Sequence, residues 1–523
     1  MNLTTFRQFT NEPVVNPWAD AAMKPLLTAG IEKARAILHS KHQLFIDGKW
    51  IDGDEGTFTT TNPNDRNETY GPFPVASVRQ TEAALAAAKK AYPAWSARPS
   101  SERARIMRDI RKKFVDEKWT LMGLMMLEIG KTGIEAYAEW AEAVDFLEYY
   151  ANSCELFHND EFLAVTALAG HKTRLNPKSL GLGVSLPPFN FPCAIFTGMW
   201  AAPTVMGNVM VVKPSPRAPS IGTFCAKLFA EAGAPVELVV EGGKNNHAIS
   251  RTLIESPDVA IITFTGSQKA GMEINLAAAL TSTRWIKRVV AEMGGCDFIA
   301  VHDFDDIAKV VDAVQASATG FQGQKCSALS RLIVKEDLYD HVKAALIEKC
   351  SSIRLKNTIE ADSILGGVID ERSKQSIADQ CAEVVNAGGK FLLGGKADEN
   401  YPGYGIPLSI HEGLVPDSDA AKMEIFGPVF GLYKAKDFDE LVRIANVTPY
   451  ALTGSLFTQR PELQARLHEF TSGNTYLNRK CTGAFVGAEP FGGWYGSGTD
   501  DKAGHWSHML RFIQWQTISE KVG

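Results

Sequence analysis

The chain contains 523 residues, 45% of them hydrophobic and 22% charged, and its formal net charge is −6. These values are typical of a soluble globular protein with several domains and exclude a disordered or fibrous chain. Lys and Arg form no run, so neither nucleic acid nor a membrane surface is expected as a partner. The eight cysteines form no CxxC pair, which indicates reduced thiols of a cytoplasmic protein, and the histidines show no zinc-ligand spacing, so no metal site is expected.

The first part of the chain predicts a hairpin followed by helices. Residues 43–60 alternate between apolar and polar types and turn at an Asp-Gly pair, which predicts a β-hairpin. Residues 80–157 are rich in Ala, Leu, Glu, Lys and Arg at helical spacing, which predicts helices. The two segments that follow, 162–170 (FLAVTALAG) and 171–176 (HKTRLN), are strand-like.

The stretch from Ser179 to Val212 has no charged residue, but four prolines interrupt it. So many broken backbone hydrogen bonds exclude a membrane-spanning helix. We predict instead a strand at GVSLPP, a helix from about Phe191 to Met206, and a second strand at NVMVVK.

Apolar runs alternate with helical stretches between about 181 and 300, and again from 298 to about 477. This alternation predicts an α/β fold built on doubly wound parallel sheets. The tail from residue 505 is more apolar and aromatic than a solvated end requires, so we predict that it docks on a neighbour.

A cysteine in an unusual setting is the first candidate for chemistry. Cys326 lies in FQGQKCSALSR (321–331), among small and polar residues. A structural cysteine packs as a small hydrophobe among apolar neighbours, whereas a nucleophilic one needs polarity and room for a substrate. On this segment alone the structural interpretation remains the commoner case.

Five further segments place a polar side chain or glycines at the end of an apolar strand or in a tight turn. Each has a plain interpretation, as a turn-stabilising amide, a solvated lysine, a helix start, a surface glutamate or a simple turn. Each could equally serve a site, because such groups hold phosphates, move protons or stabilise an oxyanion. They are PPFNFP with Asn190, VVKPSP with Lys213, FTGSQKAG with Gly266 and Gly271, AEMGG with Glu292, and EIFGPV with Glu424.

Taken in their order along the chain, the six segments resemble those of the aldehyde dehydrogenase superfamily. The resemblance extends from about residue 44 to 520. Within the superfamily the chain is most similar to the glutamate γ-semialdehyde (1-pyrroline-5-carboxylate) dehydrogenases. The resemblance favours the reactive interpretation of Cys326. The stretches that carry the closer similarity are 6–13, 141–151, 193–199, 321–331 and 478–504, of which the last is the most specific.

The resemblance implies an α/β fold with a Rossmann-like doubly wound cofactor domain, an α/β catalytic domain and a small β oligomerisation flap. Residues 1–157 and 177–292 would form the dinucleotide-binding domain with its N-terminal helices. Residues 293–484 would form the catalytic domain, and 158–176 with 485–523 the oligomerisation arm. A homodimer or higher homo-oligomer is therefore expected.

The resemblance also implies NAD(P)-dependent oxidation of an aldehyde to a carboxylic acid. The Cys326 thiolate would attack the aldehyde carbon, and the Asn190 side chain with the Cys326 backbone N–H would hold the oxyanion of the resulting thiohemiacetal. After hydride transfer to NAD, with NADP as an alternative, Glu292 would activate the water that hydrolyses the thioester. The substrate implied is L-glutamate γ-semialdehyde, oxidised to L-glutamate in proline catabolism.

Two further groups of residues are assigned by the resemblance alone. One group would bind the cofactor and the other the substrate. In the substrate-binding group, the two phenylalanines would enclose the aliphatic part of the substrate, and the other residues would hold its α-carboxylate and amine end. The expected cofactor-binding residues are Lys213, Ser215, Gly266, Ser267, Gly271, Glu424 and Phe426. The expected substrate-binding residues are Phe146, Ser327, Gly483, Ala484 and Phe491.

The chain also departs from the family pattern. Pro216 stands where an acidic residue is common, and since it has no charge to repel a 2′-phosphate and Arg217 follows it, we expect tolerance of NADP. Glu489 would bring a negative charge near an anionic substrate, which leaves another semialdehyde or an aliphatic aldehyde open. A non-catalytic binding protein of the same fold is the remote alternative. Unusual residues also occur at Cys296–Asp297 and in the segment 236–248.

Overall fold

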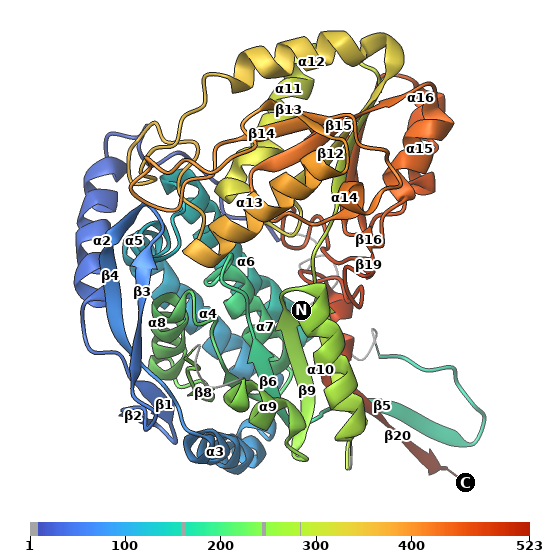
Figure 1. Ribbon diagram of the computed structural model, residues 1–523. Coiled ribbons are helices and arrows are strands. Elements are labelled where there is room, and N and C mark those ends of the chain that lie inside the picture. The colour runs from blue at the N-terminus through green and yellow to red at the C-terminus, as the bar shows by residue number, and fades with distance from the viewer. Residues whose placement is uncertain (1–8, 158–162, 243–246, 283, 523) are drawn as a thin grey trace.

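Figure 1 shows the computed structural model, in which two α/β bodies stack on one another and a narrow arm extends from them. In the part of the chain that is described, no helix is long and apolar enough to cross a membrane. Residues 1–8 and 158–162, assigned above to the cofactor domain and the arm, lie outside the described residues, as does part of the segment 236–248. The structure describes residues 9–157, 163–242, 247–282 and 284–522.

The N-terminal hairpin forms where the sequence predicts it. β1 (Leu44–Ile46) and β2 (Lys49–Ile51) pair antiparallel. Asp47 and Gly48 between them both have positive φ, 48° and 74°, as a two-residue turn that follows the twist of the strands requires. β1 also pairs with β8 (Val236–Leu238), so the hairpin extends one edge of the first sheet.

The first sheet has the strand order β10-β9-β6-β7-β8-β1-β2, and β6 to β10 run parallel. The chain runs from β6 through β7 to β8, then crosses to β9 and β10 on the other side of β6. The carboxyl ends of β6 and β9 therefore flank the point where the strand order reverses, which is where open α/β sheets bind ligands. The bounds are β6 Leu182–Leu186, β7 Val209–Val212, β9 Val259–Thr265 and β10 Arg288–Glu292.

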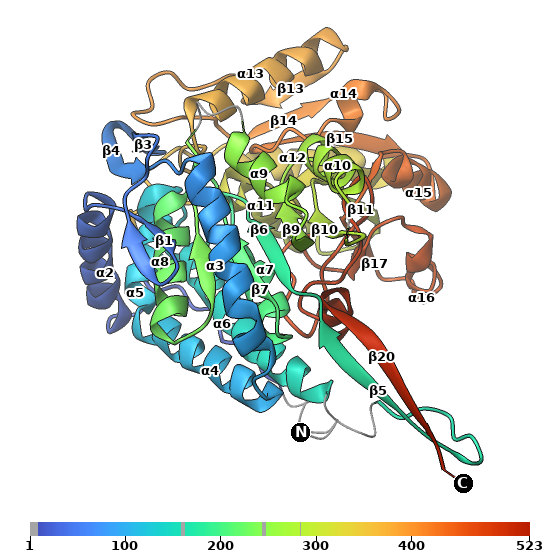
Figure 2. The ribbon, with the colours of Figure 1, turned by 90° about the horizontal axis from the view of Figure 1, so that it is seen from below.

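Helices pack on both faces of this sheet, because its strands are apolar on both sides. One group consists of α3, α9 and α10, and the other of α4 to α8 (Figure 2). The helix predicted from about Phe191 begins slightly later. The bounds are α2 Met23–Leu38, α3 Val78–Ser96, α4 Ser100–Asp116, α5 Lys118–Glu128, α6 Gly133–Leu156, α7 Ala194–Val205, α8 Pro219–Glu231, α9 Ala248–Glu255 and α10 Gln268–Leu280.

The second sheet has the order β13-β14-β15-β12-β11-β17-β18, with β13 antiparallel to its neighbour. Successive side chains of β11 lie on opposite faces of the sheet: Ile299 packs with α11 and α12 on one face, and Phe298 packs with α15 on the other. This is the predicted second α/β series. Its strands are β11 Asp297–Asp303, β12 Leu329–Lys335, β13 Lys390–Leu393, β14 Ser409–Glu412, β15 Val429–Ala435, β17 Thr453–Thr458 and β18 Asn474–Leu477. Its helices are α11 Ile307–Thr319, α12 Glu336–Cys350, α13 Glu371–Asn386, α14 Asp419–Lys422, α15 Phe438–Asn446 and α16 Pro461–Gln464.

Short elements complete the chain. β3 (Thr57–Asn62) pairs with β4 (Asp65–Pro74), and β16 (Tyr450–Ala451) pairs with β19 (Trp494–Tyr495). The 3-10 helix η2 spans Leu467–Glu469.

The arm consists of β5 (His171–Ser179) paired antiparallel with β20 (Ile513–Lys521), and it projects from the body in both views (Figures 1 and 2). The prediction of a strand over 162–170 is wrong for its described residues 163–170, because β20 pairs with β5 and the hydrogen bonding beyond it reaches no further than Gly170, whose carbonyl accepts from the Val522 N–H. Just before β20, the 3-10 helix η3 (Trp506–Phe512) buries Met509 and Phe512 against the first core.

A buried ion pair supports the start of α7. Lys131 and Glu139 pair with at most 1% of either side chain exposed. Glu139 also accepts hydrogen bonds from the backbone N–H groups of Cys193 and Ala194, at 2.8 and 3.2 Å. A carboxylate here satisfies N–H groups that have no partner within the helix and lies at the positive end of its dipole.

Replacing Lys131 by Met should therefore lower the free energy of unfolding by about 3 kcal/mol or more, since it leaves the Glu139 charge buried without a partner. Urea denaturation followed by circular dichroism measures the change. Lys112→Met, which removes an exposed pair with Asp116, serves as the control and should change stability by less than about 1 kcal/mol. Equal effects of the two substitutions would contradict the role given to Lys131.

Candidate active site

Cys326 follows a strained turn. The 3-10 helix η1 (Gly320–Gly323) leads into its loop, and Phe321, Gln322 and Gly323 are left-handed, with φ of 49°, 54° and 67°. For the two side-chain-bearing residues this conformation costs about 1–3 kcal/mol each. The surrounding structure must therefore hold the turn in place.

Two hydrogen bonds to the region around the start of α6 hold the turn from one side. Gln322 Nε2 donates to the Gly130 carbonyl at 3.1 Å, and the Phe321 backbone N–H donates to the Glu135 carboxylate. Gln322 is fully buried, so its side-chain donor needs such a partner. The left-handed turn is thereby tied to the helical side of the first body.

The first and second bodies meet at Gln324. Asn190 is buried after β6, and its Nδ2 donates to the Gln324 carbonyl at 3.0 Å, while Gln324 Oε1 accepts from the Ile369 N–H at 2.9 Å. An amide nitrogen carries two donors, so Asn190 keeps one N–H for a further acceptor near Cys326. On the other side a Cβ at Gly323 would lie 2.1 Å from the carbonyl of Gly427, which requires glycine at 323.

Glu292, the last residue of β10, is placed by the C-terminal part of the chain. The Met293 N–H donates to the Ser497 carbonyl at 2.8 Å, and the Thr499 N–H donates to the Ala291 carbonyl at 2.9 Å. An antiparallel bridge joins Glu292 to Gly498, which lies between Ser497 and Thr499. The block 478–504, the most specific part of the resemblance, thus positions the end of β10 that carries Glu292, although the two segments are far apart in the sequence.

The electrostatic environment favours the protonated forms of both reactive groups. Burial raises the pKa of Glu292 well above its ordinary value, and the Asp501 charge adds to this. Neither Glu292 oxygen has a well-aligned hydrogen-bond partner among the described residues. Burial also raises the pKa of the Cys326 thiol, with further contributions from the carboxylates of Asp297 and Glu424.

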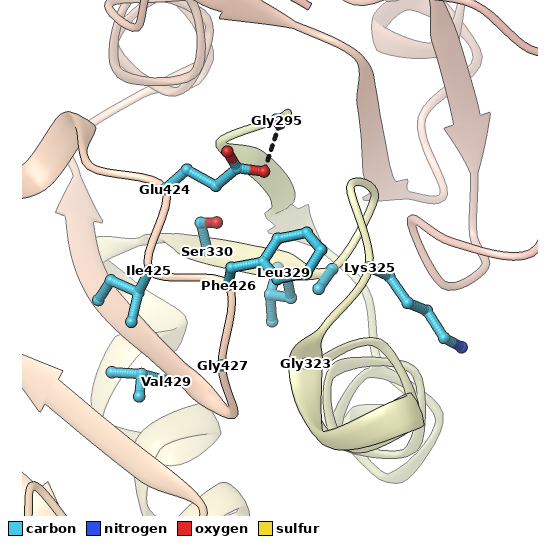
Figure 3. A pocket seen from close by; sticks show the side chains of 11 residues that line it. Gly295, Gly323, Lys325, Leu329, Ser330, Glu424, Ile425, Phe426, Gly427 and Val429 are labelled. Carbon is cyan, nitrogen blue, oxygen red and sulfur yellow. Dashed lines mark hydrogen bonds between the residues drawn. The ribbon is translucent and has the colours of Figure 1, made fainter. Parts of the chain in front are cut away.

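A pocket beside the cysteine loop is lined in part by Gly295, Lys325, Glu424 and Phe426 (Figure 3). Glu424 Oε1 accepts a hydrogen bond from the Gly295 N–H at 3.1 Å, and burial raises the pKa of Glu424 to about 7. A Cβ at Gly294 would lie 1.9 Å from Glu424 Oε2. Gly294 therefore makes room for the carboxylate of EIFGPV, and Gly295 donates a hydrogen bond to it.

The segment FTGS forms the turn from β9 into α10. Ser267 is exposed and its side chain caps the helix, which leaves helix N–H groups directed at solvent. A Cβ at Gly266 would lie 2.5 Å from the Phe264 ring, and one at Gly271 would lie 2.4 Å from Met293 Sδ. Packing within the protein thus favours a glycine at both positions.

Lys213 and Ser215 belong to a second group at the carboxyl end of β7. Lys213 is buried, and its Nζ lies 3.3 Å from Glu241. Ser215 Oγ accepts from the backbone N–H of Arg217 at 3.3 Å. The Arg217 side chain pairs with Asp370, with Nε and Oδ2 3.0 Å apart, so it points to the second body.

The loop 482–484 is tied directly to the cysteine segment. Ser327 and Thr482 share a hydrogen bond of 2.8 Å between their hydroxyls. Gly483 has φ of 83°, which favours glycine, and its carbonyl accepts from Arg479 Nη2 at 2.9 Å. Arg479 also pairs with Glu489. The negative charge of Glu489 is therefore balanced by Arg479.

The remaining predicted substrate residues come from separate elements. Phe146 on α6 is buried and stacks on Tyr150, with ring centroids 5.4 Å apart. Ala484 is half-buried beside the loop glycine. Phe491 is also half-buried, and its backbone N–H donates to the Ala503 carbonyl at 2.9 Å.

Sequence reasoning missed two titratable residues of this region. Glu142 lies one turn before Phe146 on α6, and burial raises its pKa to about 8. Lys325 precedes Cys326, and burial lowers its pKa to about 8. The position of Lys325 beside Cys326 was a usable signal, whereas nothing in the sequence sets Glu142 apart from the other glutamates of α6.

We expect iodoacetamide to alkylate Cys326 about tenfold faster for each pH unit between 7 and 9, because the thiolate reacts and a raised pKa keeps its fraction low throughout this range. Inactivation rates at constant ionic strength, with mass spectrometry of the labelled peptide, measure this dependence. Cys326→Ala should lose the labelled peptide. A rate that levels off below pH 8 would contradict the raised pKa.

The chain has relatives that match it over nearly all of its residues. Residues 50–518 match the Aldehyde dehydrogenase family. A 1-pyrroline-5-carboxylate dehydrogenase of Geobacillus thermodenitrificans is 35% identical over 515 residues, 98% of this chain and 99% of that protein. The 1-pyrroline-5-carboxylate dehydrogenase 2 of Bacillus subtilis is 37% identical over 486 residues, 92% and 93% of the two chains.

Solved structures agree with these relatives. A 1-pyrroline-5-carboxylate dehydrogenase from Thermus with bound NAD has a TM-score of 0.93 to this structure at 34% identity, covering 98% of this chain and 99% of that one. The fold class predicted from the sequence is confirmed by this likeness. Since the matches extend over nearly the whole length, the chain belongs to the aldehyde dehydrogenase family.

Proposed function

We propose that this chain oxidises L-glutamate γ-semialdehyde to L-glutamate with NAD. The observation that carries the proposal is the arrangement around Cys326, with Asn190 bonded to its loop, Glu292 close enough to influence its thiol, and the loop 482–484 joined to it through Ser327. The relatives named above carry the name of the same activity.

Cys326 begins the reaction as the nucleophile. Its thiolate attacks the aldehyde carbon, and the carbonyl oxygen becomes the oxyanion of a thiohemiacetal. The free N–H of the Asn190 amide and the backbone N–H of Cys326 are the donors for this oxygen. Both belong to segments held by the Gln324 contacts, so the donors are positioned before the substrate arrives.

The residues present fit a dinucleotide cofactor. The carboxyl ends of β6 and β9 flank the point where the strand order reverses, and α10 begins there at Ser267, where helix N–H groups suit a pyrophosphate. Lys213, Ser215 and Glu424 would hold the two riboses, and Phe426 would brace the nicotinamide, with Gly266 and Gly271 shaping the turn. When bound, NAD supplies the hydride acceptor.

Glu292 completes the reaction as the general base. It takes a proton from the water that attacks the thioester on Cys326, and the acid leaves as the thiol is restored. A carboxyl whose pKa is raised is basic enough for this task once ionised, and its oxygens have no aligned partner that would compete for the water. Because ionised Glu292 is needed, hydrolysis should accelerate with rising pH.

The substrate's amino-acid end fits the loop 482–484. Backbone N–H groups at Gly483 and Ala484, with the Ser327 hydroxyl, would bind its α-carboxylate. Phe146 and Phe491 would enclose its aliphatic part. The pairing of Glu489 with Arg479 balances the charge that had favoured a different aldehyde, so an anionic substrate remains the better fit.

We further propose that the chain acts as a cytoplasmic homo-oligomer, joined through its arm. Trp515 on the arm is 42% exposed, and Leu168, in the segment that leads into β5, is 63% exposed. A second copy that covers these apolar side chains would remove them from water.

We also propose the division that the sequence predicts. Residues 1–157 and 177–292 form the cofactor domain, 293–484 the catalytic domain, and 158–176 with 485–523 the oligomerisation region.

Glu292→Gln should retain a burst of NADH and lower the steady-state rate by about a hundredfold or more, because the amide cannot take a proton from water. Stopped-flow absorbance at substrate saturation separates the burst from the steady state. Cys326→Ala should show neither phase and still bind NAD. Normal steady-state turnover of Glu292→Gln would remove this residue from the role of base.

Ala484→Leu should lower kcat/KM for glutamate γ-semialdehyde at least about tenfold more than for propanal, since propanal has no α-carboxylate to be blocked. Ala488→Leu, at an exposed position of the same block, is the matched control and should leave both values unchanged. Steady-state kinetics with the two aldehydes test this. Equal losses in Ala484→Leu would show that the loop 482–484 is not the anchor.

A further inference from the structure

A buried carboxylate lies beside Lys213 where the sequence suggested none. Glu241 follows β8, and β7 and β8 are parallel neighbours, so the residues after them meet at one edge of the sheet. Glu241 Oε2 lies 3.3 Å from Lys213 Nζ, and only 5% of the Glu241 side chain is exposed. This is the edge on which the proposed cofactor site opens.

The carboxylate is held in its ionised form. The backbone N–H of Ser250 donates to Oε1 at 3.1 Å, and its hydroxyl donates to Oε2 at 2.6 Å. Although burial alone would raise the pKa of Glu241, the charge of Lys213 and these bonds lower it below the ordinary value. The contacts with Ser250, near the start of α9, account for a structural role, but they do not explain why Lys213 is also directed at Glu241.

We infer that Glu241 supplies the carboxylate of the adenosine ribose site, in place of the acidic residue that Pro216 lacks, and makes the chain prefer NAD to NADP. The inference rests on the proposed binding of the ribose at Lys213. Each carboxylate oxygen can accept more than one hydrogen bond, so Glu241 retains capacity for a ribose hydroxyl.

The charge of Glu241 opposes a phosphate at the 2′ position. A phosphate ester carries about −1.5 to −2 charges at neutral pH, and a nearby carboxylate of low exposure repels it. Arg217 could offset this only if it were free. Its guanidinium is instead bound to Asp370 and to the Ser373 hydroxyl, at 3.0 and 3.2 Å. The tolerance of NADP that Pro216 alone led us to expect is therefore no longer expected.

The test is equilibrium binding of NAD and NADP, measured by quenching of tryptophan fluorescence without any aldehyde present. We expect the dissociation constant of NADP for the parent enzyme to exceed that of NAD at least about tenfold. Glu241→Gln should reduce this ratio about tenfold, because it removes the charge and keeps a hydrogen-bonding side chain of the same size. Pro216→Glu should change the ratio less than about twofold, since a carboxylate is already present.

Glu237→Gln is the matched control. Glu237 lies on β8 and is also buried, but it accepts from the Asp47 N–H at 2.8 Å. Its substitution should leave the ratio unchanged. Equal binding of NAD and NADP by the parent enzyme would overturn the inference without any variant, as would an unchanged ratio in Glu241→Gln or a tenfold loss of NADP binding in Pro216→Glu. Because no aldehyde is present, these outcomes do not depend on the substrate assignment.

Discussion

The left-handed turn at residues 321–323 is the constraint on which the active site depends. Gln322 in this conformation is unfavourable by itself, and the hydrogen bonds of its Nε2 and of the Phe321 N–H to Gly130 and Glu135 hold it in place. The turn sets the direction in which Cys326 leaves it. The same contacts bring Asn190 from the first sheet to the carbonyl of Gln324, so the proposed nucleophile and the proposed oxyanion donor are held by one set of bonds.

Burial gives the site its chemical character. Desolvation raises the pKa values of both Cys326 and Glu292, and the charges of neighbouring carboxylates raise them further. A protonated thiol is less open to unwanted alkylation or oxidation than a thiolate, because the thiolate is the reactive form.

The C-terminal block contacts two parts of the candidate site. Its residues 497–499 pair with the end of β10 and so position Glu292, the proposed base. Its loop 482–484 bonds to Ser327 and is braced by Arg479, whose partner is Glu489. A single segment therefore links the base to the proposed anchor. The length and specificity of this block in the sequence follow from these two roles.

The sequence by itself determined the hairpin at Asp47-Gly48, the two α/β series and the importance of Cys326, because each rests on local chemistry or on an order of short segments. Only the tertiary structure decided which charged side chains are buried and which have a partner of opposite charge. Glu142 and Glu241 read as ordinary glutamates until burial and their neighbours are known, and Glu489 reads as an unbalanced charge until Arg479 is found beside it. The strand expected over 162–170 is absent from its described residues 163–170 for the same reason. Whether a strand has a partner, or a carboxylate has water around it, depends on residues distant in the chain, and no local pattern records that.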